Sequence, residues 1–221
     1  MAETLLRQLL DEDVWDKHAG RIEKLKSWEH YALLLSALEG LMPSALYQSP
    51  IHGQDHIERT LLFAALLALG EGVTDRTMVR QLLGCACYHD VGRVCDNYET
   101  GHGARSARQL GELTGFEGEL LRQMQGAVAA HSWPDRQMER IVGEYAPVNP
   151  ERAMELTRLL KDADGLDRPR IGDLNVRFMR HDTARELVEC GFAEYVYELY
   201  SERLHLPPPP LRGLRRRQKA E

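Results

Sequence analysis

The sequence has no long run of apolar residues and few cysteines. Its longest apolar stretch, residues 61–69, is much shorter than the roughly 18–20 residues that a membrane-spanning helix needs, so we expect no membrane partner. Four cysteines in 221 residues do not form the dense disulfide framework of a small secreted domain. The opening Met1-Ala2-Glu3 does not resemble a signal peptide. We therefore expect a cytoplasmic protein in a reducing compartment.

A strong excess of positive charge is also absent. The chain has 28 Lys and Arg against 34 Asp and Glu, a net charge of −6, which argues against a protein that coats nucleic acid by neutralising phosphates. The exception is residues 212–221, which carry five Arg or Lys and one Glu and follow four prolines at 207–210. Because proline cannot continue a helix, we predict a solvated tail over residues 207–221. Nucleic acid could bind only through this tail.

Alternating β-strand patterns are absent, and nearly every periodic segment is helical. Apolar residues recur at i, i+3 and i+4 within residues 33–41 and 57–68, as on the buried face of a helix. Asp75 stands where the N-cap of the next helix belongs. Further helices are predicted over residues 103–114, 117–131, 150–164 and 183–205. The sequence therefore predicts an all-α fold.

We expect one domain, a helical bundle, because no internal repeat and no linker divides the chain before the proline run. Residues 1–45 are predicted to form cover helices, with Trp15 and Trp28 as packing anchors. The same segment could instead form the interface of a homodimer. Residues 46–206 are predicted to form a catalytic core.

The nine histidines carry most of the functional information, because several stand at helix ends together with carboxylates. His56 opens one predicted helix, His89-Asp90 closes another, His102 opens a third and His131 ends a fourth. A cluster of Asp residues follows at 162–167. Helix ends can converge on one cavity of a bundle. Imidazole and carboxylate ligands without thiolate suit a catalytic divalent ion, with Mn, Fe, Co or Ni expected ahead of Zn or Mg.

These motifs, in this order, resemble those of the HD superfamily of metal-dependent phosphohydrolases over about residues 50–185. The likeness lies in His-Ile-Glu-Arg-Thr at 56–60, His-Asp-Val-Gly at 89–92 and Lys-Asp-Ala-Asp at 161–164. A second His-Asp pair at 181–182 has no place in this pattern. The resemblance implies metal ligands from His56, His89, Asp90 and one late Asp. Asp164 matches the superfamily's Ala-Asp-x-Leu ending better than Asp162. Asp162 and Asp167 would then support the metal ligands from behind or cap a helix.

A two-metal branch of the superfamily has two further histidines between the His-Asp pair and the last Asp. His102 and His131 match that pattern, which implies a site for two ions bridged by Asp90. The alternative is a single-metal site in which His102 and His131 bind the substrate.

The activity that the resemblance implies is hydrolysis of a phosphate ester by metal-activated water. The expected substrate is a small nucleotide-like phosphomonoester or phosphodiester. Asp90 and Lys161 are the predicted catalytic residues. The predicted substrate-binding residues are Arg93, Arg59, His52 and Arg180. His52 could also orient a ligand or cap a helix.

Two other functions stay open. Some two-metal HD proteins are mixed-valent di-iron oxygenases, which carry a Tyr and a Glu shortly before the first histidine ligand. Here Tyr47 is followed by Gln48, Ser49 and Pro50 without the Glu. A non-catalytic metal- or nucleotide-binding regulatory domain is the other possibility. The thiols of Cys85, Cys87 and Cys95 could suggest structural zinc, but their spacing favours buried reduced cysteines.

Overall fold

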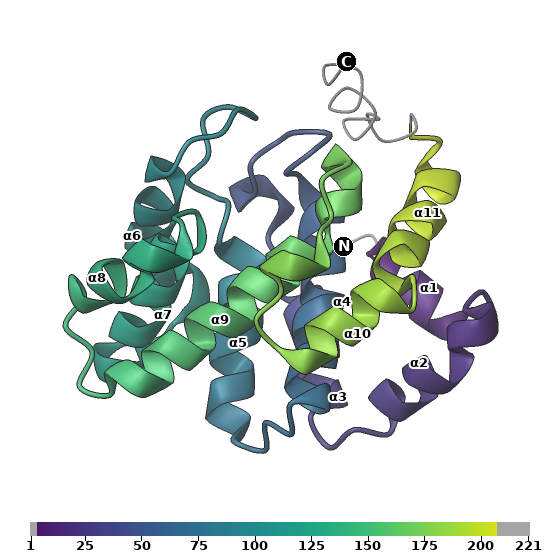
Figure 1. Cartoon of the computed structure of the whole chain (residues 1–221), viewed down its shortest axis with the longest axis horizontal. Coiled ribbons are helices and arrows are strands. Elements are labelled where there is room, and N and C mark those ends of the chain that lie inside the picture. The colour runs from purple at the N-terminus through teal and green to yellow at the C-terminus, as the bar shows by residue number, and fades with distance from the viewer. Residues whose placement is uncertain (1–3, 207–221) are drawn as a thin grey trace, which may run out of the picture.

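A computed structural model describes residues 4–206, and this part of the chain is all-helical, with eleven α-helices and no strand (Figure 1). The all-α prediction is therefore confirmed, whereas the predicted tail at 207–221 lies outside the described residues. The helices are α1 (Leu5–Asp11), α2 (Ala19–Lys26), α3 (Tyr31–Glu39), α4 (Gln54–Gly70), α5 (Arg76–Tyr88), α6 (Gly101–Thr114), α7 (Gly118–His131), α8 (Met138–Gly143), α9 (Pro150–Leu166), α10 (Asp182–Glu189) and α11 (Phe192–Leu204).

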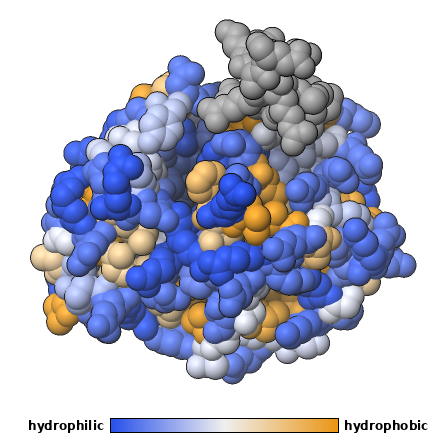
Figure 2. Space-filling model, viewed as in Figure 1, coloured by the Kyte–Doolittle hydropathy of each residue, from blue (hydrophilic) through white to orange (hydrophobic). Residues whose placement is uncertain are grey.

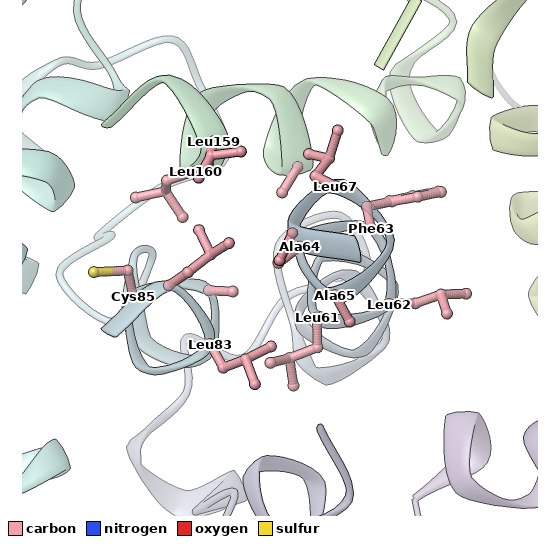
Figure 3. Packing of buried hydrophobic residues seen from close by; sticks show 14 of the residues in the cluster. Leu61, Leu62, Phe63, Ala64, Ala65, Leu67, Leu83, Cys85, Leu159 and Leu160 are labelled. Atoms are coloured by element: carbon pink, nitrogen blue, oxygen red, sulfur yellow. The ribbon is translucent and has the colours of Figure 1, made fainter. Parts of the chain in front are cut away.

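Helix α4 is the centre of the core. Every residue from position 56 to 68 is buried, so this helix is covered on all sides. Figure 3 shows Leu61, Phe63 and Leu67 pointing in different directions from its axis, with α5 and α9 on two of its flanks. Each fully buried leucine or phenylalanine contributes about 1.5–3 kcal/mol of hydrophobic stabilisation. The tight packing around α4 therefore fixes the positions of the polar residues at its start.

Side-chain caps fix where two of the site-bearing helices begin. The carboxylate of Asp75 accepts from the backbone N–H of Thr77 at 2.8 Å, which confirms the predicted N-cap of α5. Asn149 accepts from the N–H of Arg152 at 3.0 Å, and Pro150 occupies the first turn of α9. These starts set the register of both helices, and hence the directions of the residues at their ends.

The helix predicted over residues 183–205 is wrong as a single element. It is two helices, α10 and α11, that meet at Cys190 and Gly191. Gly191 has a φ of +73°, in the left-handed region that glycine adopts without steric cost. The break lets α11 fold back along α4, where Phe192 and Tyr200 are fully buried.

Helices α6 and α7 pack closely because Gly103 lies in their interface. A Cβ at this position would stand 2.6 Å from the carbonyl oxygen of Val128 and 2.8 Å from that of Ala129. Any other residue would push the two helices apart. The close approach brings His102, next to this glycine, beside His131 at the end of α7.

None of the helices in the described residues is long and apolar enough to cross a membrane. The cysteines in this part of the chain are free thiols. Cys85 and Cys87 are buried, and burial raises the pKa of Cys87 to about 12. These two side chains behave as small apolar core residues, as expected.

Candidate metal centre

Five helices direct imidazoles and carboxylates into one buried cluster. His56 lies in the first turn of α4, His89 and Asp90 directly follow α5, and His102 lies in the first turn of α6. His131 is the last residue of α7, and Asp164 lies in the last turn of α9. The structure thus brings together all six predicted ligands, and groups of them lie close enough to share a metal ion.

One half of the cluster is built around the Oδ2 atom of Asp90. The Nε2 atoms of His56 and His89 are 3.1 Å apart. They lie 3.7 Å and 3.8 Å, respectively, from Oδ2 of Asp90. Oδ1 of Asp164 completes this half at 3.5 Å from Nε2 of His56. Ligands of a transition metal bound at about 2.0–2.2 Å are separated by such distances.

The other half faces the Oδ1 atom of the same carboxylate. The Nε2 atoms of His102 and His131 are again 3.1 Å apart. They lie 3.2 Å and 3.5 Å from Oδ1 of Asp90. Asp90 therefore presents one oxygen to each pair of imidazoles.

Hydrogen bonds on the far side of the rings determine which nitrogen faces the cluster. Nδ1 of His89, His102 and His131 each lies 2.6–3.0 Å from the backbone carbonyl three residues earlier. A carbonyl oxygen can only accept, so in each neutral ring Nδ1 carries the proton and Nε2 is a bare lone pair. Nδ1 of His56 likewise meets a carboxylate oxygen of Asp167 at 2.7 Å.

The four Nε2 atoms that face the cluster and Oδ1 of Asp90 are therefore acceptors with no donor between them, and this fits a cation. Burial lowers the pKa of His56 to about 3 and that of His131 to about 4, so both rings are neutral at pH 7. Oδ1 of Asp90 is buried without a hydrogen-bond donor. Lone pairs that converge at 3.1 Å repel one another unless a positive ion lies among them.

Of the three late aspartates, Asp164 faces the cluster, whereas Asp162 and Asp167 hold other residues in place. Asp162 is fully buried and turned away from the cluster, where it accepts from the backbone N–H groups of Arg180 and His181. Asp164, in contrast, faces His56. Burial would raise the pKa of Asp164, but the Arg170 guanidinium keeps it far below its usual range. Asp164 is therefore the late aspartate that can ligate a metal.

Arg59 lines neither of the two cavities beside the cluster, which corrects its predicted role in substrate binding. Its guanidinium is buried and donates twice to Asp167, at 2.5 Å and 3.0 Å, while Asp167 orients His56. The guanidinium also lies over the ring of Tyr200, 5.0 Å from its centroid. Arg59 thus supports a candidate ligand through Asp167, in the way that outer residues commonly fix metal-bound histidines.

The remaining predicted residues lie around the cluster in different ways. Arg93 donates to Asp90 at 2.7 Å, and Nδ1 of His52 lies 3.0 Å from the same carboxylate. Lys161 donates to the backbone carbonyls of His131 and Trp133 at 3.1 Å and 2.5 Å. The ammonium of Lys161 therefore holds the end of α7 in place. Arg180, the fourth predicted substrate-binding residue, donates a hydrogen bond to Asp162 at 2.8 Å.

Arg170, which lies in the turn after α9, was not among the predicted site residues. It is 8% exposed, donates to the carbonyl of Asp167 at 2.8 Å and lies 3.3 Å from Oδ1 of Asp164. Its Nε is buried without an acceptor. Only its position six residues after Asp164 could have suggested it, because no motif marks it.

Two cavities open onto the cluster. The larger, of about 630 Å³, and the smaller, of about 470 Å³, share Tyr98, His131, Ser132, Asp164 and Arg168 in their walls. Figure 2 shows one face of the molecule, on which hydrophilic side chains predominate and hydrophobic ones gather near the centre. A small molecule could therefore reach the candidate ligands from either cavity.

Comparison with protein-family models, curated proteins and solved structures finds no match for this chain in any of the three. The likeness to the HD superfamily accordingly rests on the residues themselves. What the described residues establish is an all-helical chain with a buried His/Asp cluster that can bind metal.

Proposed function

We propose that this protein is a metal-dependent phosphohydrolase of the HD type, which hydrolyses a small, nucleotide-like phosphate ester. One observation carries the proposal: four imidazole Nε2 lone pairs converge with the carboxylates of Asp90 and Asp164 beside open cavities, and Oδ1 of Asp90 is buried without a donor. Such an oxygen and nitrogen donor set suits Mn, Fe, Co or Ni and leaves positions for water and substrate.

We further propose a pair of ions. His56, His89 and Asp164 would hold one ion together with Oδ2 of Asp90, and His102 and His131 would hold the other with Oδ1. When bound, divalent ions supply a water of lowered pKa and withdraw charge from phosphoryl oxygens.

Cationic side chains beside the cluster support phosphate as the group that is bound. Arg93, Arg168 and Arg170 line the smaller cavity, together with His52. Their guanidinium groups can donate to phosphoryl oxygens with two parallel hydrogen bonds. Arg93 and Arg170 already contact the carboxylates of Asp90 and Asp164, respectively, so a phosphoryl group held by them would lie next to the candidate ligands.

Lys161 has a positioning role in this proposal rather than contact with the reacting atoms. Its ammonium donates to the backbone carbonyls of His131 and Trp133 and lies 3.3 Å from Asp135. Burial and nearby Arg180 lower the pKa of Lys161. Asp90 keeps the catalytic role, since it alone reaches both halves of the cluster and can orient a water between them.

The test combines metal content with turnover. Protein purified without chelator or nickel resin should contain about two equivalents of Mn, Fe or Co by elemental mass spectrometry. The metal-loaded protein should release p-nitrophenol from p-nitrophenyl phosphate or its bis ester. Asp90→Asn should reduce this turnover by about 10³-fold or more, because the amide removes the charge that both halves share.

His205→Asn is the matched control, since His205 is exposed at the end of α11, away from the cluster. It should retain both metal content and turnover. Full activity of Asp90→Asn, or no bound metal after incubation with Mn²⁺ or Co²⁺, would contradict the proposal.

A further inference from the structure

The two cavities that meet at Asp164 and His131 have walls of different chemistry. The wall of the larger one contains Trp133, Phe178 and Met179, with Tyr98 shared between the two. The smaller one contains Arg93 and Arg170. The candidate metal ligands therefore lie between a cavity with aromatic walls and one in which Arg93 and Arg170 contact the carboxylates of Asp90 and Asp164.

The aromatic side chains of the larger cavity are exposed beyond what packing requires. Phe178 is 59% exposed and Tyr98 is 84% exposed, although most large apolar side chains in this part of the chain are buried. Trp133 lines the same cavity and has the Arg140 guanidinium 5.8 Å from its ring centroid. Exposed aromatic surface that borders a concave cavity gains free energy when an apolar ligand covers it.

Most charged groups in the larger cavity neutralise one another. Asp135 lies 2.6 Å from a guanidinium nitrogen of Arg180 and 3.3 Å from the ammonium of Lys161. Asp162 pairs with the other guanidinium nitrogen of Arg180. Arg136, which also belongs to the lining, is exposed. Arg168, which lines both cavities, pairs with Asp173. The exposed aromatic rings of this wall therefore lie among paired charges, and they favour an uncharged group.

We infer that the substrate is the phosphate monoester of an alcohol that carries a flat, uncharged ring system, with the ring bound in the larger cavity against Trp133 and Phe178. The inference rests on the proposed phosphohydrolase function. A cavity of about 630 Å³ has room for one or two fused rings. In the reaction, water adds to phosphorus, the ester P–O bond breaks, and the alcohol leaves with a proton from that water.

The first experiment compares 2-naphthylmethyl phosphate with ethyl phosphate on the Mn²⁺-loaded protein. Both leaving alcohols have similar acidity, so the ratio of their kcat/KM values reports binding of the ring rather than leaving-group chemistry. We expect a preference of about 30-fold or more for the ring. Equal kcat/KM values for ethyl phosphate, the naphthyl ester and the nucleotide ester used below would overturn this inference and leave the proposed function intact.

Variants connect the preference to the aromatic wall. Phe178→Ala and Trp133→Ala should each reduce the preference at least about 5-fold, since each removes aromatic surface from one side of the ring. Val148→Ala is the control, because Val148 is also an exposed apolar residue, at 78%, but lines neither cavity. A preference that survives both aromatic variants would place the ring elsewhere and overturn the inference.

A binding experiment separates this inference from the proposed function. Benzylphosphonate cannot be hydrolysed at its P–C bond in this way, so calorimetry measures its affinity whether or not the protein is a hydrolase. We expect it to bind at least about 10-fold more tightly than methylphosphonate, with the difference reduced in Phe178→Ala. If turnover fails but this difference is found, only the proposed reaction is wrong. If neither phosphonate binds, the inference is wrong too.

A flat uncharged ring could be a nucleobase or a simple aryl group. Deoxyuridine 5′-monophosphate and 2-naphthylmethyl phosphate distinguish the two sources. A higher kcat/KM for the nucleotide would assign the cavity to a nucleobase, and a higher value for the naphthyl ester would assign it to an apolar ring. Either result supports ring binding, whereas values no higher than that of ethyl phosphate for both esters would refute it.

Discussion

The two oxygens of Asp90 face different pairs of imidazoles, so single residues can test whether the cluster holds one ion or two. His102 contacts only the Oδ1 half, at 3.2 Å from the carboxylate. His102→Ala should therefore reduce the metal content from about two equivalents to about one, because the ion of the other half keeps His56, His89 and Asp164. Elemental mass spectrometry on the purified variant measures this directly.

Asp90→Asn provides the comparison for that variant, since it weakens both halves and should leave less than one equivalent. Unchanged metal content in His102→Ala would contradict a two-ion site. It would instead favour the single-metal alternative, in which His102 and His131 bind the substrate.

At the residue scale, the order of motifs along the chain predicted the six residues of the cluster but not all of their neighbours. Arg59 lies three residues after His56 and was expected to bind phosphate, yet it points toward Asp167. Sequence distance places two side chains on one helix face, but it does not say what packs against that face. Arg170 was missed for the same reason, because its approach to Asp164 depends on the turn after α9.

At the scale of elements, apolar periodicity predicted most of the site-bearing helices, including α4, α5, α7 and α9, within a few residues. The break at Gly191 was not predicted, because one glycine inside an apolar pattern is compatible with a continuous helix. The aromatic wall was not predicted either. Trp133 and Phe178 come from separate turns, and only tertiary structure places both in one cavity.

Helices α9 and α10 are joined by His181, the residue before α10. Its Nδ1 lies 2.7 Å from Asp162, and its Nε2 lies 3.0 Å from Glu155. Burial lowers the pKa of His181, but the two carboxylates outweigh burial and raise the pKa above 6.5. The protonated ring therefore stabilises this junction at low pH.

Substituting His181 should consequently affect stability in a pH-dependent way. A raised folded-state pKa means that the stabilisation is fully present below pH 6.5 and is lost as the pH rises through the folded-state value. We expect His181→Asn to lower the free energy of unfolding by about 1.5–3 kcal/mol at pH 6, the range for hydrogen bonds to charged groups, and by clearly less at pH 9. Urea denaturation followed by circular dichroism measures both values.

Asp182→Asn is the control for this measurement, because the neighbouring Asp182 side chain is 96% exposed and pairs only with Arg185 among the described ion pairs. It should change stability little at either pH. An equal loss for His181→Asn at pH 6 and pH 9 would show that the ring is not protonated in the folded protein.

At the scale of the whole molecule, the cluster couples metal binding to folding. Its members come from the ends of α4, α5, α6, α7 and α9, so the lone pairs that converge there oppose the packing of five helices in the absence of a cation. Unfolding would separate these groups, whereas binding requires them together. A metal that binds the folded chain must therefore stabilise it.

Removal of metal should lower the melting temperature of the whole domain. At a free metal concentration 100 times Kd, one bound ion stabilises the folded state by about 2.7 kcal/mol. For a domain of this size that corresponds to a shift in Tm of about 5–10 °C. Calorimetry of chelated protein before and after addition of Mn²⁺ should show this rise, whereas Asp90→Asn should show little. An unchanged Tm in the native sequence would mean that the cluster tolerates its repulsion without a cation, and the metal assignment would fail with it.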